Sequence, residues 1–82
     1  MFINVKKLNS KAKLPERATA TSAGADLCAC IDDDVVLMPG DRKLIPTGLA
    51  IAVPTGYGGF VFARSGLSSK FGVSLANCVG VI

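Results

Sequence analysis

Hydrophobic and polar positions alternate with a period of two in several short stretches of the chain. In the clearest stretch, Leu49, Ile51 and Val53 fall on one face of an extended strand, and two alanines fall on the other. No helical period is sustained, so the pattern predicts an all-β fold. Strands are predicted at residues 2–8, 25–30, 35–38, 42–45, 49–53, 60–63, 73–75 and 79–82, and a single helical turn at residues 66–71.

Proline and glycine mark the turns between these strands. Residues 39–41 (Pro-Gly-Asp) predict a tight turn, and the Gly-rich stretch after Pro54 predicts a hairpin that joins strand 49–53 to strand 60–63. Many short strands at this spacing indicate a sandwich, barrel or jelly roll. A chain of 82 residues has room for one domain only, so residues 1–82 are expected to form a single domain.

The composition predicts a folded chain with more apolar surface than it can bury alone. Half of the residues are hydrophobic and 18% are charged. A short chain has a high surface-to-volume ratio, so part of this surface is expected to be covered by other subunits or by further sequence. Residues 78–82 form an apolar strand without a polar end, and because such a strand would promote aggregation, the reading frame is expected to continue beyond Ile82.

Charge and hydropathy narrow the classes of partner. The net charge is +3, and five of the nine basic residues lie in the first seventeen positions, where they form either a solvated segment or an anion-attracting arm. Because no aromatic residues are interleaved with these lysines, no nucleic-acid partner is expected. No apolar run is long enough to span a bilayer, and the chain does not begin like a signal peptide. A cytoplasmic protein without membrane contact is expected.

Three cysteines and the lack of histidine restrict the chemistry. Cys28, Cys30 and Cys78 do not have the spacing of a zinc site, and they are expected to be buried, reduced side chains without a metal or redox role. Without an imidazole, a Ser-His-Asp triad, a Cys-His pair and an HExxH zinc helix are excluded. A general base from this chain must then be a carboxylate or a lysine.

Residues 64–72 bring together two cations, several hydroxyl groups and two glycines directly after a predicted strand. Gly66 would allow the backbone to approach an anion, backbone N–H groups and the Ser65 hydroxyl would donate hydrogen bonds, and Arg64 would supply charge. The spacing is not that of a Walker A loop. The segment is interpreted either as a phosphate-binding loop or as a strand-to-helix turn capped by serine.

Two further polar residues stand in apolar surroundings. Asp26 follows the small residues 22–25, and it either caps that turn or supports a Mg²⁺ and phosphate site, since Mg²⁺ prefers hard oxygen ligands. Asn77 precedes the apolar residues 78–82, and it either belongs to a turn or presents its amide to a flat polar ring. All three constellations occur together, in a fixed order, in a short chain, and this favours the functional interpretation.

Taken together, these motifs resemble those of the trimeric dUTP diphosphatases (dUTPases). Residues 22–27 look like that family's first motif, residues 64–67 with Lys70 and Gly72 look like its second, and residues 77–82 look like the start of its third. Residues 44–54 and the Gly-Tyr-Gly turn after them are similar to the family's connection between the first two motifs. The resemblance covers nearly the whole chain.

The resemblance implies a jelly-roll-like or barrel-like fold of short strands, incomplete in this chain. It also implies a homotrimer with shared active sites and Mg²⁺-assisted hydrolysis of dUTP to dUMP and pyrophosphate. For the site, it implies that the phosphates are bound by Arg64, Ser65 and Gly66, the uracil by Asn77 and the deoxyribose by Val81 and Ile82, and that Asp26 indirectly supports the metal region.

The chain also departs from the family's pattern. The third motif of the family continues with an aspartate that activates the water and a tyrosine that selects deoxyribose. The catalytic base is therefore expected beyond Ile82, and residues 1–82 alone are expected to be inactive. Ala63 stands where many relatives have proline, a change that affects turn rigidity more than chemistry. Two alternatives stay open: a dCTP deaminase relative with the same fold, and a non-catalytic β module or remnant that assembles or binds nucleotide.

Overall fold

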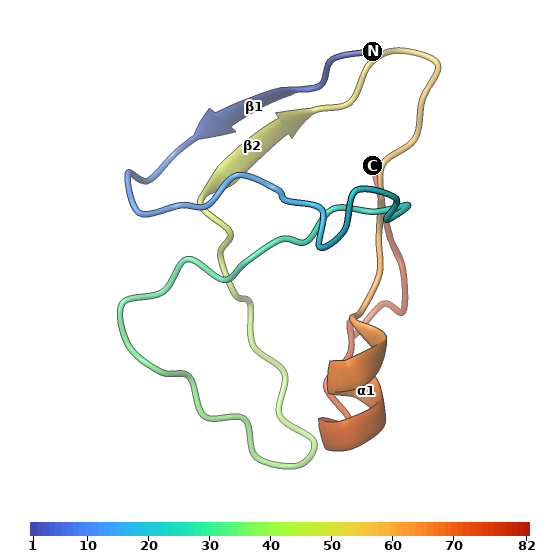
Figure 1. Cartoon of the computed structure of the whole chain (residues 1–82). Coiled ribbons are helices and arrows are strands. Elements are labelled where there is room, and N and C mark those ends of the chain that lie inside the picture. Colours follow the sequence, from blue (N-terminus) through green and yellow to red (C-terminus); the bar gives the residue numbers. More distant parts are fainter. The chain divides into compact units, whose positions relative to one another are not determined.

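The computed structural model describes the whole chain, Met1–Ile82. Its elements in chain order are β1 (Asn4–Lys7), β2 (Leu49–Ala52), β3 (Phe60–Val61), α1 (Ser65–Phe71) and β4 (Gly80–Val81) (Figure 1). Short strands outnumber the single helix, and the predicted all-β class is confirmed. The helix is neither long nor apolar enough to cross a membrane.

The chain divides into two compact units, Met1–Ala52 and Val53–Ile82, and each is described by itself. The first unit contains β1 and β2, and the second contains β3, α1 and β4. The expectation of one domain over residues 1–82 stays a prediction.

The sheet of the first unit joins the two ends of that unit. Strands β1 and β2 pair in antiparallel fashion with Asn4 opposite Ala52 and Val5 opposite Ile51. Along β2, Leu49 and Ile51 are half-buried while the two alanines between and after them are exposed, so the predicted alternation is confirmed. The half-buried Val5 and Ile51 form a cross-strand apolar pair, which is the contact that stabilises such a ladder.

The centre of the first unit is a close approach around Gly48. Ala12 is the only buried residue of the chain, at 3% exposure. A Cβ atom on Gly48 would lie 2.9 Å from the Ala12 Cβ and 3.1 Å from the Cys30 Sγ, so only glycine fits there. Two backbone bonds tie this region together: Leu8 N–H donates to the Gly48 carbonyl (2.7 Å), and Cys30 N–H donates to the carbonyl of Pro46 (2.7 Å).

Three strand predictions in the first unit are wrong. Residues 25–30 contribute only one isolated bridge, between Glu16 and Asp26. Residues 35–38 and 42–45 are not strands, although the turn predicted at 39–41 forms, with Asp41 N–H donating to the Met38 carbonyl (2.9 Å) and its carboxylate accepting Met38 N–H (2.9 Å). The flanking segments are exposed, and an isolated hairpin without a third strand or a covering layer is marginal.

The second unit has a two-residue ladder in which Phe60 pairs with Val81 and Val61 with Gly80. The ladder extends by two further bonds, because Gly59 and Ile82 exchange N–H groups and carbonyls at 2.9 and 2.8 Å. The predicted hairpin between 49–53 and 60–63 is therefore wrong: β2 pairs with β1, and β3 pairs with β4. The turn itself forms at Pro54, whose carbonyl accepts Tyr57 N–H at 3.1 Å. After this turn, however, the backbone N–H and carbonyl of Gly59 are bonded to Ile82.

The helical turn predicted at 66–71 is confirmed as α1, which begins one residue earlier. Gly72 ends the helix in the left-handed conformation (φ 67°), its N–H donates to the Ser68 carbonyl at 3.0 Å, and the N–H of Val73 donates to the Leu67 carbonyl at 3.3 Å. Residues 73–75 are not a strand, so that prediction is wrong. The strand predicted at residues 79–82 is present as β4, which is shorter and covers Gly80–Val81.

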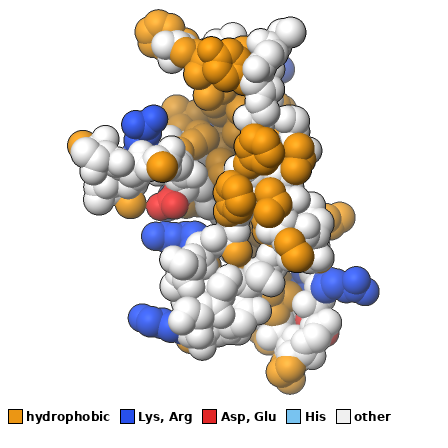
Figure 2. Space-filling model, turned by 90° about the vertical axis from the view of Figure 1, so that its right-hand side faces the viewer, with side chains coloured by type: hydrophobic (Ala, Val, Ile, Leu, Met, Phe, Trp, Pro, Cys, Tyr) orange, Lys and Arg blue, Asp and Glu red, His pale blue; other side chains and the backbone are white.

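Many apolar side chains of both units face solvent. Phe2 is 95% exposed, Leu44 is fully exposed at 101%, and Phe71 is 72% exposed. Figure 2 shows many hydrophobic side chains on the visible surface of the molecule. This agrees with the expectation from composition that the chain carries more apolar surface than it buries, and what covers that surface stays a prediction.

Candidate functional site

The predicted phosphate-binding residues lie where β3 leads into α1. Arg64 occupies the N-cap position with an extended backbone (φ −72°, ψ 127°), and its carbonyl accepts the N–H of Ser68 at 3.0 Å. Ser65 and Gly66 form the first helical positions, and all three residues are exposed. The segment is the strand-to-helix turn of the alternative interpretation, but no side chain caps the helix, so only the serine cap of that interpretation is wrong.

The electrostatics of this segment favour an anion at its start. The first turn of α1 contains no acidic residue, and its leading N–H groups lack intrahelical partners, as at any helix start. Arg64 adds a guanidinium at that end, whereas Lys70 lies in the last turn, where a cation complements the helix dipole. Nothing lies within 4 Å of the position that a Gly66 Cβ would take, so the backbone there is open to approach.

Asn77 lies in a tight turn of the same unit. Cys78 N–H donates to the Leu75 carbonyl (3.1 Å), and Val79 N–H donates to the Asn77 carbonyl (2.7 Å). Cys78 adopts φ 66°, the only positive value at a non-glycine residue in the chain. A left-handed residue with a side chain carries a backbone cost that the two neighbouring bonds must offset. The turn therefore holds Asn77 exposed, just before β4.

Val81 and Ile82, predicted to line the deoxyribose, lie at the end of the ladder with β3. Their side chains are 71% and 65% exposed, so both are open to a ligand. A Cβ atom on Gly59 would stand 3.4 Å from the Ile82 Cβ and 3.0 Å from a Val53 methyl group. The Ile82 side chain thus lies close against Gly59, and the two backbone bonds between these residues fix the place of Ile82 in the ladder.

Asp26 lies in the other unit, where its backbone pairs with that of Glu16. Asp26 N–H donates to the Glu16 carbonyl at 2.8 Å, and Glu16 N–H donates in return at 3.3 Å. The residue is half-buried. The turn before it is closed by Ser22, whose hydroxyl accepts Thr19 N–H at 3.1 Å and lies 2.7 Å from the Thr19 hydroxyl. The backbone of Asp26 is thereby held in place by its pairing with Glu16.

The three cysteines differ from their predicted burial. All three are unbridged, and the expectation that they are buried is wrong for Cys28 and Cys78, which are exposed, while Cys30 is half-buried. The reason is that the units bury almost nothing apart from Ala12. No group of three or more Cys, Asp or Glu side chains is placed to hold a metal ion.

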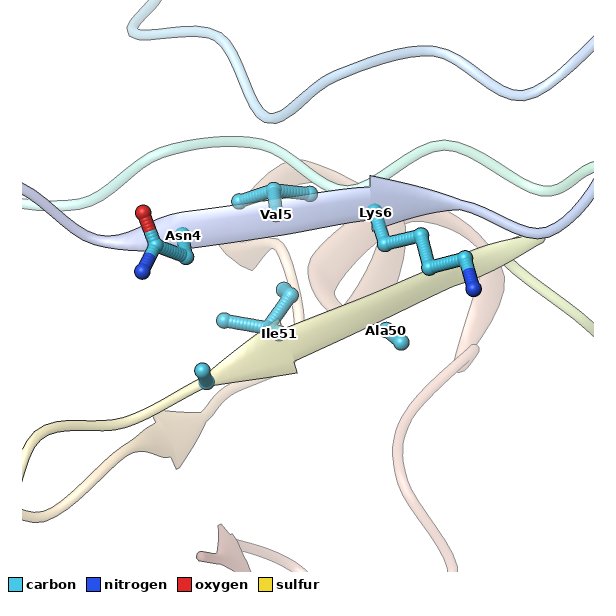
Figure 3. A pocket seen from close by; sticks show the side chains of 6 residues that line it. Asn4, Val5, Lys6, Ala50 and Ile51 are labelled. Atoms are coloured by element: carbon cyan, nitrogen blue, oxygen red, sulfur yellow. The ribbon is translucent and has the colours of Figure 1, made fainter.

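One shallow depression, of about 290 Å³, lies on the sheet of the first unit. It is lined by β1 and β2, and Figure 3 shows the side chains that project from the two strands around it. Its only charged residue is Lys6, and it contains none of the predicted site residues. The depression is the surface of a two-stranded ladder and has no constellation for chemistry.

Sequence reasoning missed two residues that shape the second unit. The Ser68 hydroxyl donates to the carbonyl of Val73 at 2.8 Å, and Gly59 pairs with Ile82. The only sequence signal for the first is the position of Gly72, which ends a helix and turns the chain back toward it. For the second, the consecutive glycines at 58 and 59 signal a close backbone approach.

Comparison with known proteins identifies the family of this chain. A family model described as dUTPase matches residues 10–82. A curated deoxyuridine 5′-triphosphate nucleotidohydrolase of Syntrophotalea carbinolica is 51% identical over 80 residues, which cover 98% of this chain and 54% of that protein. The protein of that name from Desulfitobacterium hafniense is 58% identical over 71 residues, covering 85% of this chain and 47% of the relative. That of Burkholderia mallei is 47% identical over 85 residues, covering 100% and 57%.

The chain spans about half the length of the curated relatives it matches. The match to the family model nevertheless runs through all three predicted motifs, from the segment before Asp26 to Ile82. The resemblance inferred from the motifs is confirmed, and the chain belongs to the dUTPase family.

Proposed function

We propose that this chain is part of an enzyme that hydrolyses dUTP to dUMP and pyrophosphate. The observation that carries the proposal is that two of the motifs lie in one compact unit, where residues 64–66 follow β3 and residues 77–82 contain β4, the strand that pairs with β3. Family membership and the printed names of the relatives support the substrate. In this proposal, Arg64, Ser65 and Gly66 bind the phosphates and Asn77 binds the uracil.

The remaining contacts follow from exposure and from the sequence motifs. Val81 and Ile82 would cover the deoxyribose with their exposed side chains, and Asp26 would support the phosphate and metal region from its half-buried position. We also propose that the protein is a cytoplasmic homotrimer, because a second and third copy would cover the exposed apolar side chains of each unit.

The proposed metal is Mg²⁺, which would neutralise charge that develops on the phosphates. The donor set of this chain fits only a minor share of the coordination, since no group of three acidic or Cys side chains is close enough to hold an ion. This suits Mg²⁺, which keeps several waters and takes one or two carboxylates together with substrate phosphates. Asp26 is the residue of this chain that would take part, directly or through water.

The test is nucleotide hydrolysis by the protein that contains these residues, with dUTP, dCTP and dTTP compared in Mg²⁺ and in a chelator. We expect turnover of dUTP alone, and only with Mg²⁺. Turnover of dCTP to a deaminated product would instead assign the protein to the deaminase branch, and binding without turnover would assign it to a non-catalytic module. For residues 1–82 alone we expect no turnover, because they span about half the length of the relatives.

Ser65→Ala tests the site itself. Loss of a hydrogen bond to a charged phosphate should cost about 1–3 kcal/mol of transition-state stabilisation, seen as a fall in kcat/KM of roughly 5- to 150-fold. Ser69→Ala is the matched control, since Ser69 is exposed on the same helix. Equal kinetics for the two variants would refute the role assigned to Ser65.

A further inference from the structure

The turn before β4 is closed around Cys78 by two backbone bonds. The N–H of Cys78 donates to the Leu75 carbonyl at 3.1 Å, and the N–H of Val79 donates to the Asn77 carbonyl at 2.7 Å. The second bond joins residues two apart around a central residue with φ 66°, which is the arrangement of a γ-turn with a positive φ. Such a turn is rare and strained, because the side chain of an L-residue crowds the carbonyl that follows it.

The strain is confined to this one position. Every other positive φ in the chain is at a glycine, so Cys78 is the only residue whose side chain is carried on a left-handed backbone. Strain of this kind persists only where the surrounding contacts impose it, and it clusters at functional sites. The contacts here are the two bonds of the turn and the pairing of β4 with β3 directly after it. They hold one backbone conformation at residue 78 against its cost.

The Asn77 side chain depends on this backbone for its position. The residue is exposed, and its amide makes no hydrogen bond to another group of the chain. Because neither burial nor a side-chain bond fixes the amide, the backbone angles at residues 77 and 78 set where it lies relative to β4. The residues proposed to cover the deoxyribose, Val81 and Ile82, follow on the same continuous segment.

We propose that Cys78 is a positioning residue: its left-handed backbone sets where the Asn77 amide lies relative to residues 81–82. This inference rests on the proposed function. The uracil and the deoxyribose are then held by one segment of one chain, whichever copy of the chain supplies residues 64–66. Apparent affinity for the nucleoside falls with the fraction of molecules in which the turn has the competent conformation. The backbone conformation of residue 78 matters for binding, and its thiol does not.

The experiment follows two ligands by NMR titration of the protein that contains these residues. Deoxyuridine offers only base and sugar, and inorganic tripolyphosphate offers only phosphates. Cys78→Val places a β-branched side chain on the left-handed backbone, so it should weaken deoxyuridine about 5- to 10-fold and leave tripolyphosphate unchanged. Ala76→Val is the matched control, because it adds the same side chain to an exposed residue of the same turn whose φ is not positive. It should change neither ligand.

Two further variants separate the backbone from the thiol. Cys78→Gly and Cys78→Asn both remove the sulfur, but both residue types tolerate the left-handed backbone. Each should therefore bind deoxyuridine within about twofold of the parent protein. In the hydrolysis assay, Cys78→Val should raise the KM for dUTP at an unchanged kcat, while Cys78→Gly should keep the KM of the parent.

Three results overturn the proposal. Loss of deoxyuridine binding in Cys78→Gly as well as in Cys78→Val would mean that the thiol is used and the backbone conformation is not. Equal weakening of both ligands in Cys78→Val would mean that the substitution disturbs the structure in general. Unchanged deoxyuridine binding in Cys78→Val would mean that Asn77 does not depend on this backbone.

Failure of the proposed function has its own signature, because the parent protein then binds neither deoxyuridine nor dUTP. The dependence of the turn on residue 78 is decided in that case by hydrogen exchange at the Val79 amide, which closes the γ-turn. The protection of this amide is corrected for the intrinsic rate of each sequence. Lower protection in Cys78→Val than in Ala76→Val supports the positioning link, and equal protection in the two variants overturns it.

Discussion

The contacts inside the first unit differ in kind from the contacts inside the second unit. Residues 1–52 depend on contacts between distant segments: β1 pairs with β2 from the opposite end of the unit, and Leu8 and Cys30 bond to residues 46–48. Residues 53–82 depend more on local contacts, with α1, its C-terminal turn and the turn at Asn77 all closed by near neighbours. Distant contacts require tight packing to offset the entropy of closing long loops, whereas local turns require mainly suitable backbone angles.

Two glycines make this difference measurable. Gly48 in the first unit and Gly72 in the second have nearly the same backbone angle, φ 69° and φ 67°. A side chain on Gly48 would meet Ala12 at 2.9 Å, but one on Gly72 would meet nothing within 4 Å. Replacing both by alanine imposes the same left-handed backbone, so the difference between the two effects reports packing alone.

The largest effect is expected for Gly48→Ala. The left-handed backbone costs about 1–2 kcal/mol for alanine, and the overlap with Ala12 and Cys30 adds about 1–3 kcal/mol. The variant should therefore lose protection from hydrogen exchange at the amides of Leu8 and Cys30, which bond to this region. Gly24→Ala is the control in the same unit, because its Cβ meets nothing within 4 Å and its φ is not positive. Equal behaviour of the two variants would contradict the close packing at Gly48.

A smaller effect is expected for Gly72→Ala. Only the backbone cost of about 1–2 kcal/mol applies, since the site is open. Hydrogen exchange should accelerate at the amides of residues 72 and 73, which donate to carbonyls of α1. The amides of the β3–β4 ladder should keep their protection. A loss as large as that of Gly48→Ala would show that the second unit also depends on packing at this point.

The difference between local and distant contacts also determines how much of the fold can be predicted from the sequence. Alternation located β2, and the position of Gly72 agrees with the end of α1, because these features depend on neighbouring residues. Pairing was not predictable in the same way. The choice between β3 and β1 as the partner of β2 depends on contacts between distant residues such as Val5 and Ile51. A period of two specifies a strand face and leaves its partner open.

For the candidate site, residue types in a fixed order identified residues 64–66 and the segment from Asn77 to Ile82, and the structure gathers these in one unit. Their proposed contacts with nucleotide stay a prediction. The Ser68 hydroxyl could not be recognised because its partner is a backbone carbonyl, and every residue type supplies one. The exposure of Cys28 and Cys78 was missed because composition describes how apolar a chain is and leaves open which residues it buries.

The smallest effect is expected for the ion pair of the first unit. The Lys11 ammonium lies 3.0 Å from the Asp32 carboxylate and joins two distant segments, but the two side chains are 74% and 78% exposed. Solvent and salt screen such a pair, so a double-mutant cycle of Lys11→Ala and Asp32→Ala should give a coupling of about 0–0.5 kcal/mol. The coupling is measured from urea unfolding at low and at high salt, and it should shrink further at high salt. A coupling above about 1 kcal/mol that persists in salt would mean that charge, in addition to packing at Gly48, holds the distant segments of this unit together.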